Sequence, residues 1–150
     1  MLERMKEVVK KEGSARESAR MFAYEVLPSL LDNLPDDFAG FLLGVIDAGY
    51  APVDWTFYSY MNTHFLWLSK GDYGMRIEWV DYGWLKEHPY VNPCPSKPLV
   101  TLSLRRCPHI MVKAYYTDVN ISEMEKALDE KLKDPQNAQC RANDEKSSQG

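Results

Sequence analysis

The chain of 150 residues has no apolar run of the roughly 18 to 20 residues that a membrane-spanning helix requires. Its longest apolar stretch, residues 38–51, is interrupted by Gly44, Asp47 and Gly49. Residues 1–6 alternate charged and apolar side chains, so they lack the continuous apolar core of a signal peptide. We therefore expect a cytoplasmic protein that has no membrane partner.

Basic residues are not in excess either, because the net charge is −4 and acids and bases are spread evenly along the chain. Neutralising phosphates requires a basic surface, so this balance disfavours a dedicated nucleic-acid-binding protein. A basic patch confined to one face of the fold stays open, because position along the chain does not tell which side chains gather in space.

Cysteine is scarce, with only Cys94, Cys107 and Cys140. An odd number argues against a disulfide framework and is typical of a reducing compartment. Cys94 and Cys107 flank a predicted strand at opposite ends, so a bridge between them is not expected. Cys107 and His109 stand close together, but a structural zinc site usually takes two such ligand pairs at short spacing. We therefore predict neither a metal nor a cofactor.

Motifs that identify a reaction are also missing. The chain contains neither G-x-G-x-x-G nor G-x-x-x-x-G-K-[ST], which excludes nucleotide hydrolysis by a P-loop. G-x-S-x-G and H-E-x-x-H are absent as well. A small enzyme built on Cys107 and His109 is left as an alternative, although residues i and i+2 of a turn rarely face each other. We predict no catalytic residue.

Helical periodicity is present at both ends of the chain. Apolar stripes predict helices over the residue ranges 2–12, 14–33, about 37–48 and 120–133.

Local signals mark where these helices begin and end. Ser14 and Glu17 form a capping-box pattern at the start of the second helix, and Pro28 predicts a kink or a break inside it. Asp36 or Asp37 is expected to cap the third helix. After the last helix nothing apolar recurs, so residues 135–150, with Cys140, are predicted to be a disordered tail.

Between the helices, the period changes and aromatic residues accumulate. All four tryptophans and most tyrosines lie between residues 53 and 116. Alternating aliphatic and polar or aromatic residues, bounded by turn residues, predict strands joined by hairpins. The predicted turns are residues 70–74 and 106–109. The predicted strands are residues 53–58, 64–69, 75–80, 99–105 and 110–116. Residues 81–98 form a long loop with a short helix near Trp84.

The segregation of helices from strands predicts an α+β fold. We expect a single domain over residues 1–134, with N-terminal helices, an antiparallel meander of four to five strands and a C-terminal helix, followed by the disordered tail. A winged-helix variant is the alternative, but it needs a basic recognition helix, and the third predicted helix contains no lysine or arginine.

Alternation divides the predicted sheet into two faces. Val53, Trp55 and the aliphatic residues of the later strands should face the helices, leaving a polar and aromatic face accessible. Such a face is either simply solvated or a binding surface, since tyrosine and arginine are enriched where proteins meet. The residues predicted to bind, on this face and in the long loop, are Tyr58, Tyr60, Arg76, Arg105, Arg106, Lys113, Tyr115, Trp84 and Tyr90.

From these features we expect a non-enzymatic protein-interaction module. It would bind a protein partner, or a second copy of itself, through the aromatic sheet face and the long loop. The alternative is a nucleic-acid-binding accessory protein, in which bases stack on the tyrosines and phosphates contact the arginines.

Overall fold

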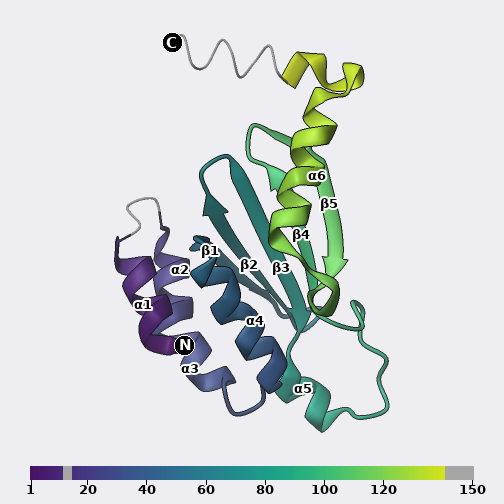
Figure 1. The fold of residues 1–150 in the computed structure, drawn as a ribbon. Coiled ribbons are helices and arrows are strands. Elements are labelled where there is room, and N and C mark those ends of the chain that lie inside the picture. The colour runs from purple at the N-terminus through teal and green to yellow at the C-terminus, as the bar shows by residue number, and fades with distance from the viewer. Residues whose placement is uncertain (12–14, 141–150) are drawn as a thin grey trace.

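A computed structural model of the chain describes residues 1–11 and 15–140. Here the fold is α+β with two layers, a five-stranded antiparallel sheet in the order β1-β2-β3-β4-β5 and helices on one of its faces (Figure 1). This confirms the predicted meander between N-terminal helices and a C-terminal helix. The strands are β1 (Ala51–Tyr58), β2 (Thr63–Lys70), β3 (Tyr73–Val80), β4 (Leu99–Leu104) and β5 (Cys107–Tyr115).

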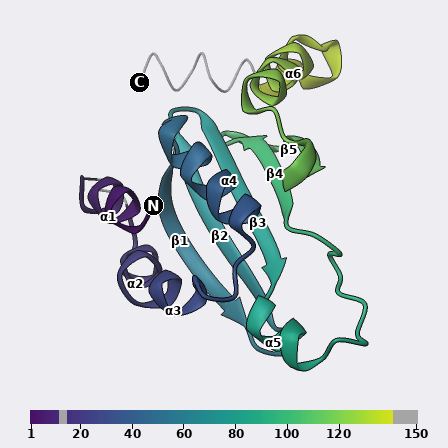
Figure 2. The ribbon, with the colours of Figure 1, turned by 60° about the horizontal axis from the view of Figure 1, so that its bottom comes forward.

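The sheet is covered by helices that precede the strands in the sequence and by one that follows them. The helices are α1 (Leu2–Lys11), α2 (Glu17–Met21), α3 (Leu27–Leu30), α4 (Asp36–Asp47), α5 (Tyr82–Glu87) and α6 (Ile121–Lys133). Figure 2 shows α1 to α3 beside β1, α4 over the middle of the sheet and α6 beside β5. Within the described residues, no helix is both long and apolar enough to cross a membrane.

The core forms between α4 and the strand residues that point toward it. Alternation predicted Met75, Ile77, Trp79, Val100 and Leu102 on the covered face, and each is at most 2% exposed. The Trp79 ring meets the Phe38 ring of α4 edge to face, with 5.3 Å between centroids. Such pairs add to the stabilisation from burial.

Val53 departs from this alternation. A register shift between Pro52 and Asp54 leaves it without a partner on β2, and it lines the open face instead. The expected position of Val53 on the covered face is therefore wrong, because a bulge breaks the two-residue period of a strand.

The predicted kink at Pro28 takes the form of a π-helical turn. Residues Phe22–Val26 form this turn, and the Leu27 amide donates to the carbonyl of Phe22, five residues earlier. A proline has no amide hydrogen and its ring crowds the preceding turn, so a local change of helical pitch accommodates it. The predicted cap Ser14 lies outside the described residues.

The third predicted helix begins at Asp36, but neither aspartate caps it. Pro35 occupies the cap position and no side chain caps the helix there. Asp37 instead accepts hydrogen bonds from the Phe38 amide, at 2.9 Å, and from the Tyr116 hydroxyl, at 2.7 Å. At the other end, Gly49 follows the helix with a φ of 102°, a conformation that glycine adopts readily.

Two predictions near the C-terminus are wrong. The second hairpin turns at Arg105 and Arg106, because Leu104 already pairs with Cys107, and Pro108, which has no amide hydrogen, lies in a bulge. Residues 135–140 are not a disordered tail, since they form a 3₁₀ turn and a short helical segment. The remainder of the predicted tail, residues 141–150, lies outside the described residues.

The cysteines also depart from expectation. Cys107 and Cys140 form a disulfide across 33 residues, whereas Cys94 is free and exposed. The sequence analysis did not predict this bond, because an odd number of cysteines argues against a disulfide framework.

Candidate functional site

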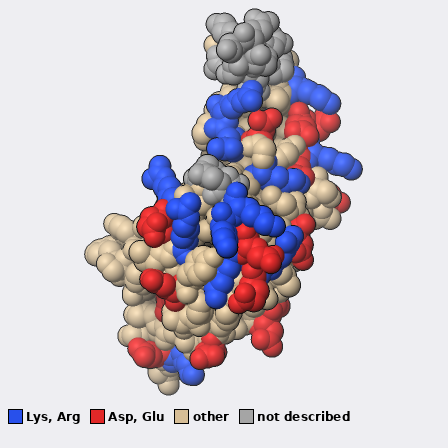
Figure 3. Space-filling model, turned by 90° about the vertical axis from the view of Figure 1, so that its left-hand side faces the viewer, with Lys and Arg blue, Asp and Glu red and all other residues tan. Residues whose placement is uncertain are grey.

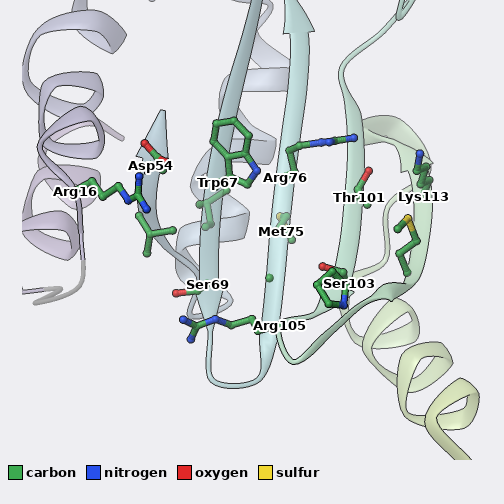
Figure 4. Close-up of a pocket in the computed structure, with 15 residues that line it drawn as sticks. Arg16, Asp54, Trp67, Ser69, Met75, Arg76, Thr101, Ser103, Arg105 and Lys113 are labelled. Carbon is green, nitrogen blue, oxygen red and sulfur yellow. Dashed lines mark ion pairs between the residues drawn. The ribbon is translucent and has the colours of Figure 1, made fainter. Parts of the chain in front are cut away.

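The face of the sheet turned away from the helices is hollowed into a groove of about 730 Å³. Arg16 and all five strands contribute to its lining. Figure 4 shows the groove, crossed from one side to the other by residues of successive strands. We call this hollow the open-face groove.

One row of side chains forms the floor of the open-face groove. In the register of the sheet, Asp54 lies opposite Trp67, Trp67 opposite Arg76, Arg76 opposite Thr101, and Thr101 opposite Lys113. Directly opposed residues on neighbouring strands lie on the same face and close enough to interact. The meander therefore aligns one aromatic and two cationic side chains around a threonine (Figure 4).

Arg76 and Thr101 each carry a buried polar atom that has no hydrogen-bond partner among residues 1–11 and 15–140. These atoms are the Arg76 Nε and the Thr101 Oγ1. The Thr101 residue is only 7% exposed. Figure 4 shows the Arg76 side chain extending from β3 toward β4, where Thr101 lies. An unpaired buried polar group costs about 1 to 3 kcal/mol, so such pairs of atoms are uncommon in folded proteins.

The tip of Arg76 is held by a neighbour on its own strand. Its Nη2 donates to Glu78 Oε1 at 3.1 Å. The guanidinium also lies 6.0 Å from the centre of the Phe65 ring, which itself stacks against Trp67. Half-buried aromatic rings therefore flank the arginine on the same face.

Arg105 closes the groove from the turn between β4 and β5. Its side chain donates to the Gly71 carbonyl at 3.1 Å, and Figure 4 shows it over the β2–β3 hairpin, toward Ser69. Its stem passes Gly74, where an added Cβ would lie 3.4 Å from Arg105 Cγ, an ordinary van der Waals contact.

Arg16 and Asp54 form the opposite wall. The Arg16 amide donates to the Val53 carbonyl at 2.9 Å, and the Arg16 guanidinium lies 3.6 Å from the Asp54 carboxylate. Ser18 also donates to Asp54. These contacts join the start of α2 to the bulged part of β1.

The charge of the groove is opposite in sign to that of the whole chain. Arg16, Arg76, Arg105 and Lys113 line it, and Asp54 is the acid among its lining residues. Within residues 1–11 and 15–140, neither Arg105 nor Lys113 makes an ion pair. On the side of α1 and α2, by contrast, acidic side chains lie between and beside the basic ones (Figure 3).

The structure brings only some of the predicted binding residues together. Arg76, Arg105 and Lys113 line the open-face groove. Tyr115 is on the same face but one row away, opposite Leu99. Arg106 points elsewhere, since it pairs with Asp72 at 3.4 Å and lines a second hollow.

The remaining predicted residues lie at the far end of the sheet. Tyr58 and Tyr60 contact each other at the β1–β2 turn, with 6.3 Å between ring centroids. Trp84, in α5, stacks on His88, the residue that follows this helix. Tyr90, in the loop, is 98% exposed. Figure 1 shows α5 and the following loop at the end of the sheet away from the β2–β3 turn. These residues do not line the groove.

Trp67 and Arg16 are lining residues that sequence reasoning missed. Trp67 stands between Leu66 and Leu68, and this alternation was a signal for the face opposite the core. Arg16 had no such signal, because its position depends on the contact between the start of α2 and β1.

A buried histidine elsewhere has the geometry of a catalytic dyad but a structural role. His64 Nε2 lies 2.6 Å from Asp81 Oδ1, and Trp55 Nε1 donates to His64 Nδ1 at 3.3 Å. The proton is therefore on Nε2 and is donated to Asp81, which also caps α5 through the Trp84 amide. Burial lowers the pKa of His64, although Asp81 acts in the opposite direction. The residue is only 3% exposed and anchors the sheet to α5.

The other chemical candidates are not supported. Cys107 is bonded to Cys140, so in this structure it has no free thiol to act as a nucleophile. His109 lies 3.7 Å from the Cys140 sulfur. Among the residues that the structure describes, no three His, Cys, Asp or Glu side chains are grouped to hold a metal ion.

Comparison of the chain with protein-family models, with curated proteins and with solved structures finds no match in any of the three.

Proposed function

We propose that this protein is a non-enzymatic protein-interaction module whose open-face groove receives a segment of a partner. The observation that carries this proposal is the groove floor, where an uncovered sheet face has two buried polar atoms without a hydrogen-bond partner in the part of the chain that the structure describes. A face that was merely solvated would leave its polar groups to water. A central aromatic residue and arginine with a polar surround are typical of interaction hot spots.

The long loop contributes less to the proposed binding site than the sequence suggested. Tyr58, Tyr60, Trp84 and Tyr90 lie beyond the end of the groove, so they would contact a partner only if it extended along the whole sheet. Residues of the groove should therefore matter more for binding than these aromatics do.

A random peptide library displayed on phage tests the proposal. Peptides selected on the wild-type protein are synthesised, and their affinities are measured by fluorescence polarisation against two variants. We expect Trp67→Ala to weaken binding by about tenfold or more, as truncation of a central anchor does. Trp84→Ala, a tryptophan outside the groove, is the matched control and should leave affinity unchanged. Binding that ignores Trp67, or a selection that yields no peptide, would refute the proposal.

A second copy of this chain is an alternative partner. Sedimentation velocity of the pure protein over a range of concentrations distinguishes self-association from binding of a different protein. Self-association through the groove predicts a dimer that Trp67→Ala dissociates and Trp84→Ala does not.

Single-stranded nucleic acid is the second candidate function. It is favoured by the stacked Phe65 and Trp67 rings, 5.9 Å apart, beside Arg76. Bases stack on such platforms, and binding would fall steeply with salt. Co-sedimentation with a fluorescent oligonucleotide at two salt concentrations tests it, and an affinity that Arg105→Ala leaves unchanged would count against it.

Cytoplasmic localisation remains a prediction from the sequence. The Cys107–Cys140 disulfide argues for an oxidising environment instead, because such bonds persist mainly outside the reducing cytosol.

A further inference from the structure

The unpartnered atoms of the groove floor face the same place from two strands. Arg76 and Thr101 are directly opposed in the β3–β4 register, and Thr101 is directly opposed to Lys113 in the next pair. An arginine and a lysine have only donors, and a threonine hydroxyl donates as well as accepts. Three donors in one row fit an acceptor that carries negative charge.

We propose that this row is a carboxylate-binding subsite, in which Arg76, Thr101 and Lys113 hold an aspartate or glutamate side chain of an acidic partner segment. The inference rests on the proposed function, since it names the chemistry of the segment that the open-face groove receives. Charge complementarity supports it, because cations predominate among the charged residues that line the groove.

Glu78 acts as an internal substitute for the partner's carboxylate. It accepts from Arg76 Nη2 at 3.1 Å, through the one hydrogen bond that the structure records between them. Arginine can bind a carboxylate through two parallel hydrogen bonds, which is a stronger arrangement. An incoming carboxylate can therefore compete with Glu78 for the guanidinium.

The two unpartnered atoms are less accessible than the rest of the Arg76 side chain. The side chain of Arg76 is 36% exposed, whereas its Nε and the Thr101 hydroxyl are buried. We expect an incoming carboxylate to draw the guanidinium away from Glu78, so that Arg76 Nε and the Thr101 hydroxyl reach the carboxylate. Both atoms then gain a partner in the same event.

An acidic peptide fits this row better than a nucleic acid does. Two of the four nearby cations are already matched, Arg16 by Asp54 and Arg76 by Glu78. A nucleic-acid strand needs a track of cations along its phosphates. A single row that contains Lys113 and Arg76, whose pairing with Glu78 a ligand can displace, instead suits a single carboxylate.

The test uses the full chain and two defined probes. One is an acetylated, amidated hexapeptide of alternating glutamate and leucine, and the other replaces each glutamate with glutamine. Titrations are followed by ¹H–¹⁵N NMR. We expect the glutamate peptide to shift the amide signals of Thr101 and Lys113 and to bind about tenfold more tightly than the glutamine peptide, as charged hydrogen bonds are stronger.

Three variants separate the subsite from general attraction. Thr101→Val should weaken the glutamate peptide about fivefold by removing one hydrogen bond. Glu78→Gln should strengthen it about fivefold, since the internal competitor loses its charge. Thr117→Val, which removes a hydroxyl at an exposed position in the turn after β5 and outside the groove lining, is the control and should change nothing.

Several results would overturn the subsite. These are equal affinity for both peptides, no shift at Thr101 and Lys113, or an affinity that Glu78→Gln lowers. An oligo-thymidine that binds more tightly than the glutamate peptide would assign the face to nucleic acid instead. If the subsite fails while phage-selected peptides still depend on Trp67, the proposed groove function stands. If those peptides ignore Trp67, the proposed function itself fails.

Discussion

Replacing Thr101 by valine should make the protein more stable, although it removes a polar group from a native strand. The Thr101 hydroxyl is buried and has no hydrogen-bond partner within the described residues, so on folding it loses contact with water and gains no hydrogen bond in return. Valine keeps the branched shape that the strand and its neighbours accommodate, and it leaves no cavity. Removal of such a group should raise the free energy of unfolding by about 1 to 2 kcal/mol.

A second buried threonine of the same sheet provides a matched control. Thr63 is 1% exposed, and its hydroxyl donates to the Met61 carbonyl at 2.9 Å. Thr63→Val removes this donor and leaves the carbonyl without it. We expect the free energy of unfolding to fall by about 1 kcal/mol. The same chemical change should therefore have opposite signs at the two positions.

Urea denaturation followed by tryptophan fluorescence measures both variants, and thermal melting followed by circular dichroism provides a second readout. For a chain of this length, each kcal/mol corresponds to a shift of about 2 to 4 °C in Tm. A Thr101→Val protein destabilised as much as Thr63→Val would mean that the hydroxyl has a partner in the folded state. That result would remove the basis of the carboxylate subsite. The expected variant is more stable but binds more weakly, which separates stability from function at one residue.

Two further predictions concern the disulfide and the buried histidine. Reducing the Cys107–Cys140 bond, which spans 33 residues, should lower the free energy of unfolding by about 3 to 4 kcal/mol, since a loop of that length restricts the unfolded chain. Cys94→Ser, at an exposed free thiol, should change nothing, and equal stability with and without reductant would contradict the prediction. Because burial lowers the pKa of His64 below its usual 6.5, the unfolded chain binds its proton more readily, and stability should fall as pH drops below about 6.5. Urea denaturation from pH 8 to 5 should show that the free energy of unfolding falls more steeply for the wild type than for His64→Gln. If the two proteins lost stability in parallel, the histidine would not be the cause.

Local patterns were sufficient for most of the secondary structure. The helical stripe predicted over residues 120–133 corresponds to α6, Ile121–Lys133, and Asn120 caps its start by accepting from the Glu123 amide. The hairpin at residues 70–74 is also confirmed, with a turn at Gly71 and Asp72. These features depend on neighbours within a few residues, so the sequence contains their physical cause.

Several features of the candidate site could not be obtained in this way. Alternation placed Arg76 and Lys113 on the accessible face, but it did not bring them into one row with Trp67 and Thr101. That alignment depends on the register of four strands, each set by contacts across the sheet. The bulge at Val53 likewise belongs to the pairing of β1 with β2.

The sequence by itself determined the segregation of helices from strands and which residues of most strands are buried, because hydrophobic periodicity acts within one element. Only the tertiary structure decided that all the covering helices pack on one face of the sheet and leave the other open. It also decided that Cys140 reaches Cys107, and that Arg76 and Thr101, each with a buried polar atom lacking a partner among the described residues, stand opposite each other in the sheet. These three features depend on contacts between residues far apart along the chain. The interaction energy of such a contact depends on both residues being brought together, so it cannot be read from either sequence position alone.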